Sequence, residues 1–124
     1  MNLQESGEMY LETIYLLTKE KPHVRAIDIS EYMGFSKPSV SRAIGLLRNG
    51  GYITVDADGH ITLTDAGCEI SSKIYRRHRV LTRLLMHIGV AEDVAAEEAC
   101  KIEHHISKTN FDALKTFLET KANL

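Results

Sequence analysis

Apolar residues recur every three or four positions along most of this chain, which is the spacing of one face of an α-helix. The first such segment covers residues 7–20 and ends before Pro22, because proline disfavours helix at the residue that precedes it. Similar patterns predict short helices over residues 25–33 and 36–49, a long helix over 65–86, and two more over 91–106 and 107–121. The pattern therefore predicts a mainly α-helical protein.

The junction between the second and third predicted helices carries the signals of a tight turn. Gly34 stands at the end of the second helix, where a left-handed residue is common. Ser36 is placed to cap the third helix, and Pro38 falls in its first turn. Asn49-Gly50-Gly51 then ends that helix. These signals predict a helix-turn-helix.

One stretch departs from the helical period. Residues 52–55 and 60–64 are rich in β-branched and aromatic residues, and Asp56-Ala57-Asp58-Gly59 separates them. The Asp-Gly pair is a strong signal for the turn of a β-hairpin. Combined with the preceding helices, the hairpin predicts a winged helix-turn-helix over residues 26–63, followed by a helical domain. In that domain the apolar stripe of the last helix, Phe111, Leu114, Phe117 and Leu118, is more than a chain this small can readily bury alone, so we expect it to support dimerisation.

Charge is unevenly distributed, although the formal net charge is only -2. No acidic residue occurs from Tyr32 to Val55, so the third helix can approach a phosphate backbone. In this motif the start of that helix enters the major groove, where an arginine such as Arg42 can contact guanine. The outward-facing candidates are Ser36, Lys37, Pro38, Ser39, Ser41 and Arg42. The alternative is that Ser36 only caps the helix and that Arg42 is a solvated charge.

The segment EEACKIEHH, residues 97–105, carries candidate metal chemistry. In a helix, Cys100, Glu103 and His104 would lie on one face within about one turn. A thiol, a carboxylate and an imidazole together are metal ligands of mixed softness. Taken alone, the C-x-x-E-H spacing is a weak signal, because a solvated surface helix explains it as well. The sequence offers no general base beyond these ligands, which argues against a metalloenzyme.

The cellular compartment follows from the cysteines and the amino terminus. Cys68 and Cys100 are the only cysteines; Cys68 is expected in the core. The polar start MNLQESGEMY is unlike a signal peptide, and no apolar run approaches the roughly 18 residues that span a membrane. We therefore expect a cytoplasmic protein, in which thiols stay reduced and available as ligands.

Three segments together, GEMYLETIY, RRHRVLTRLL and EEACKIEHHIS, resemble the diphtheria-toxin-repressor family, which includes iron-dependent and manganese-dependent repressors. The resemblance extends over nearly the whole chain. It implies a homodimer that binds palindromic operator DNA, in a short form without the SH3-like third domain. It also implies a DNA-binding domain over residues 1–73 and a metal-binding and dimerisation domain over 74–124, with a divalent metal between them.

The resemblance further implies which residues bind the metal: Met9, Glu12, His78, Cys100, Glu103 and His104. Iron-dependent members have methionine and cysteine where this chain has Met9 and Cys100, whereas manganese-dependent members have carboxylates at both. Glu12 matches the manganese type. The iron type's ancillary site needs glutamate and histidine where this chain has Thr82 and Ala96, which argues against that second site.

Softness decides the expected cofactor. Thioether and thiolate favour metals later in the first row than Mn(II). We therefore expect a metal-dependent transcriptional repressor that responds to Fe(II) and controls metal-homeostasis genes, with Mn(II) as the alternative cofactor. Zn(II), Co(II) and Ni(II) should also bind in vitro, and Cys100 has either its sulfur or its backbone carbonyl to offer. A winged-helix regulator that senses an organic ligand or no ligand is the other alternative, and activation instead of repression stays open.

Overall fold

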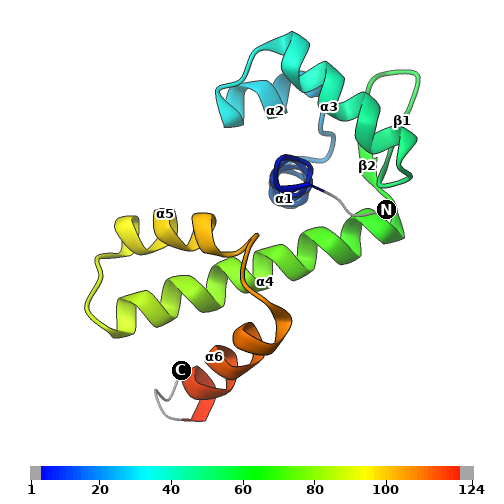
Figure 1. Ribbon diagram of the computed structural model, residues 1–124. Coiled ribbons are helices and arrows are strands. Elements are labelled where there is room, and N and C mark those ends of the chain that lie inside the picture. Colours follow the sequence, from blue (N-terminus) through cyan, green and yellow to red (C-terminus); the bar gives the residue numbers. More distant parts are fainter. Residues whose placement is uncertain (1–3, 121–124) are drawn as a thin grey trace. The chain divides into compact units, whose positions relative to one another are not determined.

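The computed structural model describes residues 4–120 and confirms a mainly α-helical fold (Figure 1). Each predicted helix and both predicted strands are present, with ends that differ by a few residues from those expected. Residue 121, the last of the final predicted helix, lies outside the described residues. In chain order the elements are α1 (Glu5–Glu20), α2 (Ala26–Met33), α3 (Lys37–Asn49), β1 (Ile53–Val55), β2 (Ile61–Leu63), α4 (Asp65–His87), α5 (Glu92–Ile102) and α6 (Lys108–Thr120).

The chain divides into two compact units, and the boundary between Ser72 and Lys73 falls inside α4. In the first unit, α1 packs against α2, α3 and β2, and α3 packs against β1. Fully burying one aliphatic side chain contributes roughly 1.5–3 kcal/mol, so this cluster accounts for much of the unit's stability. Its buried members are Tyr10, Leu11, Ile14, Leu17, Val24, Ile29, Val40, Ile44, Leu47, Tyr52, Ile53 and Ile61.

Local capping fixes the two helices of the DNA-reading motif, as the sequence predicts. Gly34 ends α2 with a left-handed φ of 73°, and the Ser36 side chain accepts a hydrogen bond from the backbone N–H of Ser39 at the start of α3. At the start of α2, Asp28 accepts a hydrogen bond from the backbone N–H of Arg25. A hydrogen bond from Lys21 to the same carboxyl, together with that backbone bond, holds the pKa of Asp28 below its usual value.

The hairpin forms the predicted wing. β1 and β2 are antiparallel, with Ile53 opposite Leu63 and Val55 opposite Ile61. Between them, Asp56 Oδ1 accepts hydrogen bonds from the backbone N–H groups of Asp58 and His60 at 2.9 and 2.8 Å, which closes the turn. The first unit is therefore a winged helix-turn-helix.

Gly67, in the first turn of α4, lies against the backbone of residue 52. Thr64 caps this helix by accepting the Gly67 N–H at 3.2 Å. A Cβ atom on Gly67 would lie 2.0 Å from the carbonyl oxygen of Tyr52, which is far inside van der Waals contact. Glycine is therefore required for α4 to begin this close to the hairpin. Cys68, the next residue, is exposed, so the expectation that it lies in the core is wrong.

The second unit comprises the later part of α4 together with α5 and α6. Figure 1 shows α5 running alongside that part of α4, and hydrogen bonds join Arg77 and His78 of α4 to Glu103 just beyond α5. Alanines line the inner face of α5, while larger side chains are buried on the other two helices. The buried apolar residues are Ile74, Leu81, Ala95, Ala99, Phe111 and Leu118.

The helix predicted over residues 91–106 ends earlier, at Ile102. Residues 103–105 form a turn in which the N–H groups of His105 and Ile106 both bond to the carbonyl of Ile102. The Arg77 side chain donates hydrogen bonds to the carbonyl oxygens of Glu103 and Ile106. The predicted end was wrong: a side chain from a distant helix holds this turn, and local periodicity does not report such a contact.

Gly67→Ala should destabilise the protein by about 1–3 kcal/mol or more, because the added methyl group collides with a backbone carbonyl that cannot move independently. Urea unfolding followed by circular dichroism measures the loss. Gly45→Ala is the matched control, since a Cβ there meets nothing within 4 Å and lies inside α3. The control should be neutral or more stable by up to about 1 kcal/mol. Equal losses in both variants would contradict the close approach at Gly67.

Candidate metal centre and DNA-binding surface

The start of α3 presents all of the predicted DNA-contacting residues to solvent. The opposite face of the helix is buried through Val40, Ile44 and Leu47, which leaves the polar face directed outward. Ser36 Oγ donates to Ser39 Oγ at 2.9 Å, so these two hydroxyls also order the first turn. The exposed residues are Ser36, Lys37, Pro38, Ser39, Ser41 and Arg42.

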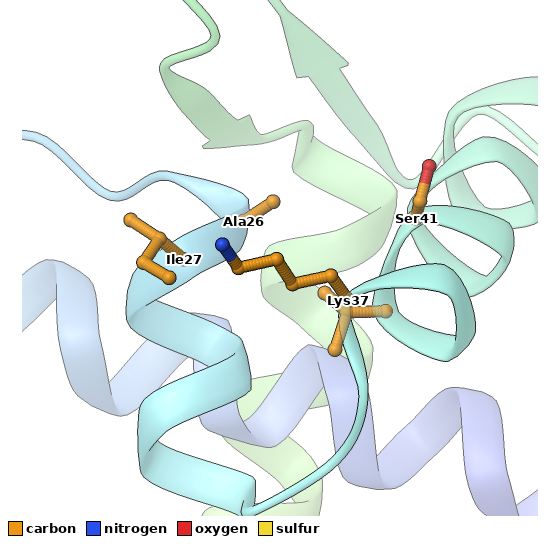
Figure 2. Close-up of a pocket in the computed structure, with 5 residues that line it drawn as sticks. Ala26, Ile27, Lys37 and Ser41 are labelled. Carbon is orange, nitrogen blue, oxygen red and sulfur yellow. The ribbon is translucent and has the colours of Figure 1, made fainter.

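A pocket of about 370 Å³ lies between α2 and α3 on this surface. It is lined by Ala26 and Ile27 of α2 and by Lys37, Val40 and Ser41 of α3. Figure 2 shows the Lys37 side chain extending from α3 toward the first turn of α2. A helix amino terminus and an ammonium group both favour an anion, so the surface is suited to a phosphate. Sequence reasoning missed Ala26 and Ile27, because only the packing of α2 against α3 places them beside this surface.

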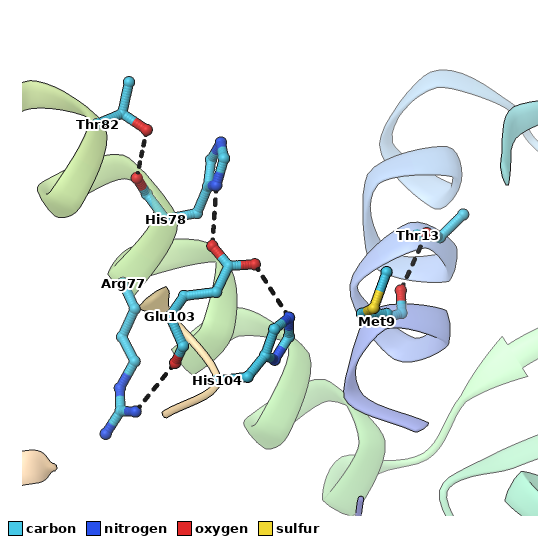
Figure 3. Close-up of polar contacts among 7 residues, drawn as sticks. All are labelled: Met9, Thr13, Arg77, His78, Thr82, Glu103 and His104. Atoms are coloured by element: carbon cyan, nitrogen blue, oxygen red, sulfur yellow. Dashed lines mark hydrogen bonds and ion pairs between the residues drawn. The ribbon is translucent and has the colours of Figure 1, made fainter. Parts of the chain in front are cut away.

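Two of the predicted metal ligands lie on α1 in the first unit. Met9 is partly buried, and the Thr13 hydroxyl donates to its carbonyl at 3.0 Å (Figure 3). Glu12, one helical turn further along, is only 9% exposed. The spacing of three residues puts Met9 and Glu12 on adjacent positions of one helix face. A buried carboxylate is uncommon in proteins, so Glu12 stands out from the other acidic residues of α1.

In the second unit, the turn after α5 brings a carboxyl group between two imidazoles. His78 Nδ1 lies 2.9 Å from Glu103 Oε2, and His104 Nε2 lies 3.4 Å from Glu103 Oε1 (Figure 3). The side chains of Glu103 and His104 are 0% and 1% exposed, whereas that of His78 is 27% exposed. His78 thus forms one cluster with Glu103 and His104, which lie 25 and 26 positions further along the chain.

This cluster fits a divalent metal. Glu103 Oε1 is buried and accepts no hydrogen bond within the part of the chain that the structure describes. A buried polar atom left without such a bond costs free energy, which a coordinated cation would offset. Imidazole nitrogen and carboxylate oxygen are both ligands for first-row divalent metals. Cys100, partly buried in the last turn of α5, lies one helical turn before Glu103.

The two positions of the iron type's ancillary ligands, Thr82 and Ala96, line a separate pocket of about 380 Å³ beside His78. The Thr82 hydroxyl donates to the backbone carbonyl of His78 at 2.7 Å, and Ala96 has no ligand atom. Arg79 and Arg83 line the same pocket. Glu92 lines it as well, so the charges of the pocket are mixed, and Thr82 and Ala96 supply neither the carboxylate nor the imidazole of the iron type's ancillary site.

Arg77 belongs to a basic stretch of α4 but, unlike Arg76 and Arg79 beside it, is buried. The residue is only 8% exposed, and its side chain contacts the turn after α5. A signal was available: Ile74, Arg77 and Leu81 share the inward face of α4 at helical spacing.

No helix in the described part of the chain, residues 4–120, is long and apolar enough to cross a membrane.

Comparison with known families matches both halves of the chain. The iron-dependent repressor N-terminal DNA-binding domain matches residues 2–61, and the iron-dependent repressor metal-binding and dimerisation domain matches residues 64–122. The first match covers nearly all of the winged helix-turn-helix, and the second covers the helical unit that contains Glu103.

Individual relatives agree. The chain is 31% identical over 114 residues to the transcriptional regulator MntR of Lysinibacillus sphaericus, covering 92% of this chain and 82% of that protein. It is 35% identical over 107 residues to the iron-dependent repressor IdeR of Mycobacterium tuberculosis, covering 86% of this chain and 46% of that protein.

Among solved structures, the metal-dependent transcriptional regulator MtsR aligns with a TM-score of 0.85 at 31% identity, over 91% of this chain. The present chain spans about half of that structure, 53% of its length. The family consists of DNA-binding transcriptional regulators and not of enzymes. With both of its halves matched, this chain belongs to the iron-dependent repressor family, the metal-dependent transcriptional repressors related to diphtheria toxin repressor that its sequence resembles.

Proposed function

We propose that this protein is an Fe(II)-responsive repressor of metal-homeostasis genes. The observation that carries the proposal is the buried carboxyl group of Glu103 between His78 and His104. We further propose that residues 1–73 read DNA, that residues 74–124 bind metal and dimerise, and that the protein acts in the cytoplasm, where the operator is. The proposed ligands are Met9, Glu12, His78, Cys100, Glu103 and His104.

The proposed ligands come from both units, which suggests how metal would control DNA binding. Met9 and Glu12 belong to α1, and α1 packs directly against α2 and α3. When bound, the metal would supply a positive charge to the proposed ligands. If Met9 and Glu12 bound a metal, α1 would be held in place, and α3, the helix proposed to enter the major groove, would be held with it. Metal would favour the conformer in which all the ligands can bind it. The shift in population is limited by how much more tightly that conformer binds metal than the other conformers do.

The choice of metal rests on the chain's own ligands. One relative named above is MntR and another is an iron-dependent repressor, so their names favour neither metal. Met9 and Cys100 are softer than carboxylates, which favours Fe(II) over Mn(II). Glu12 is a hard ligand and makes Mn(II) the alternative. Zn(II), Co(II) and Ni(II) should bind in vitro, since raw affinity discriminates poorly among these ions.

A homodimer on palindromic DNA is the second part of the proposal. Two recognition helices on one dimer can enter successive major grooves about one helical turn apart. Of the apolar stripe on α6, Phe111 and Leu118 are buried within the single chain, so they are not dimer contacts by themselves. The second unit nevertheless exposes apolar side chains that a second copy could cover. They are Met86, Ile88, Val94, Ile102 and Phe117.

One other function is compatible with the fold. In a metal-independent regulator, the cluster around Glu103 would serve only to hold the turn after α5. Its contacts would then be complete without a cation, whereas Glu103 Oε1 accepts no hydrogen bond from the described residues. This observation favours the metal sensor.

Operator binding should require divalent metal. An electrophoretic mobility shift with a family-type palindrome, under anaerobic and reducing conditions, is expected to show tight binding with Fe(II) and at least about tenfold weaker binding with chelator, a difference of about 1.4 kcal/mol. Glu103→Gln should behave like the chelated wild type, because the amide is a poorer metal ligand. Equal operator affinity with and without chelator would refute the sensor and favour the metal-independent regulator.

Arg42→Ala should weaken operator binding by roughly 1–3 kcal/mol and reduce discrimination against random DNA, because a base contact is lost. Fluorescence anisotropy with operator and scrambled duplexes measures both effects. Arg48→Ala is the matched control, since it removes the same charge from the last turn of α3. If the two variants lose affinity equally for both duplexes, Arg42 contributes charge and does not read bases.

The double substitution Met9→Asp plus Cys100→Glu should shift the response from Fe(II) toward Mn(II). Mn(II) prefers hard oxygen ligands and stands lowest in the affinity order, so a soft pair penalises it most. The measurement is the metal concentration for half-maximal operator binding, with reductant present to keep Cys100 reduced. Cys68→Glu, which replaces an exposed thiol, is the control and should change neither value. A wild type that responds to Mn(II) at lower concentration than to Fe(II) would show that Glu12 is the better guide.

A further inference from the structure

The guanidinium group of Arg77 is buried against the turn that carries two of the proposed ligands. Its Nη1 donates one hydrogen bond to the Glu103 carbonyl at 3.2 Å and another to the Ile106 carbonyl at 2.9 Å. The guanidinium carbon lies 5.4 Å from the centre of the Phe111 ring on α6. Arg77 therefore joins α4, the turn after α5, and α6.

These two carbonyl groups lie at a place where the backbone would otherwise lack partners. The last carbonyls of a helix have no intrahelical donor, and a cation near that end is favourable. Glu103 is the residue that caps α5. By bonding to the carbonyls on both sides of residues 104 and 105, one side chain fixes the path of the whole turn.

Arg77 and His78 act on the same residue in two different ways. Arg77 holds the main chain of Glu103, and His78 contacts its carboxyl group at 2.9 Å (Figure 3). With its backbone and its side chain both restrained, Glu103 loses little further freedom when it binds a ligand. Residues that orient metal ligands from outside the coordination shell commonly contribute 10–100-fold to affinity.

The arrangement is not optimised for stability alone. Arg77 Nε is buried and makes no hydrogen bond within the described residues. A buried donor without a partner costs roughly 1–3 kcal/mol. An apolar side chain filling the same space beside Phe111 would avoid that cost, so the retained guanidinium points to a task beyond packing.

We propose that Arg77 is a positioning residue of the metal centre, holding the carbonyls of Glu103 and Ile106 so that Glu103 and His104 are ordered before metal binds. This inference rests on the proposed function, because it assumes that these two residues are ligands. The positive charge of Arg77 is directed to main-chain oxygens, so it orders the ligands without occupying the carboxyl oxygen that faces His104.

Arg77→Met tests the proposal in the full-length chain, with Co(II) as a spectroscopic probe. The variant should bind Co(II) 10–100-fold more weakly than wild type, and its saturated visible spectrum should differ because the ligands are less ordered. Amide hydrogen exchange at residues 103–106 of the metal-free protein should be faster. Arg76→Met, on the adjacent and exposed position of α4, is the matched control and should match wild type in all three measurements.

Arg77→Lys covers the case in which the methionine variant does not fold. Its ammonium group keeps the charge but lies closer to the α4 backbone than Nη1, so it cannot take both carbonyls without movement. An intermediate loss of Co(II) affinity with an altered spectrum supports the proposal. If folded Arg77 variants keep the wild-type affinity and spectrum, even with a lower melting temperature, Arg77 is only structural and the proposal is wrong.

The same titration separates this inference from the function on which it rests. Wild-type protein that binds no Co(II), or Glu103→Gln that binds it as well as wild type, would overturn the proposed metal centre and the role of Arg77 with it. Loss of binding in Glu103→Gln with undiminished binding in the Arg77 variants would overturn the role of Arg77 alone.

Discussion

The buried carboxyl group of Glu103 is the main constraint on the second unit, because it needs polar partners from the elements around it. Removing a charged or polar group from water costs several kcal/mol unless partners replace the water. Here the partners come from different elements: His78 from α4 and His104 from the turn itself. The buried face of α5, which precedes the turn, carries the small residues Ala95 and Ala99. A hydrophobic core of the same size would lack ligand atoms, whereas this cluster would offer a carboxylate and two imidazoles to the proposed metal.

The first unit fixes the position of α3 while one face of that helix stays exposed. α3 buries Val40, Ile44 and Leu47 and leaves its polar face outward. Its cap at Ser36 and the left-handed turn at Gly34 fix where the exposed face begins. α1 packs against both α2 and α3, so it directly contacts the two helices of the DNA-reading motif. A metal that engages Glu12 would therefore act on DNA binding through packed helices, with no need for a change inside them.

The proposed ligands combine hard and soft atoms, and this mixture bears on the choice between iron and manganese. In the proposed ligand set, the carboxylates of Glu12 and Glu103 would supply hard oxygen ligands, Met9 would supply sulfur, and Cys100 would supply either its sulfur or its carbonyl oxygen. Affinity for such a set rises along the first transition row, so selectivity against later metals comes from their availability in the cell. In this proposal the soft pair would penalise Mn(II) without excluding Zn(II), and a reducing compartment would keep the thiol able to bind metal.

Local features of the sequence determined most of the fold, whereas the full set of metal-ligand candidates came from the resemblance to a family. Gly34, Ser36 and the Asp58-Gly59 pair specify a turn, a cap and a hairpin through backbone conformations and hydrogen bonds that span only a few residues. The C-x-x-E-H spacing around Cys100 gained its meaning from the resemblance of the whole chain to a repressor family.

Tertiary structure decided the features that depend on partners distant in the chain. It ended α5 at Ile102, and Arg77 of α4 holds the turn that follows through the carbonyls of Glu103 and Ile106. It exposed Cys68, and it made Gly67 obligatory through the carbonyl of Tyr52. His78 reaches Glu103 across 25 positions of sequence for the same reason. Helical periodicity reports which face of a helix is apolar, whereas only packing determines which groups meet at that face.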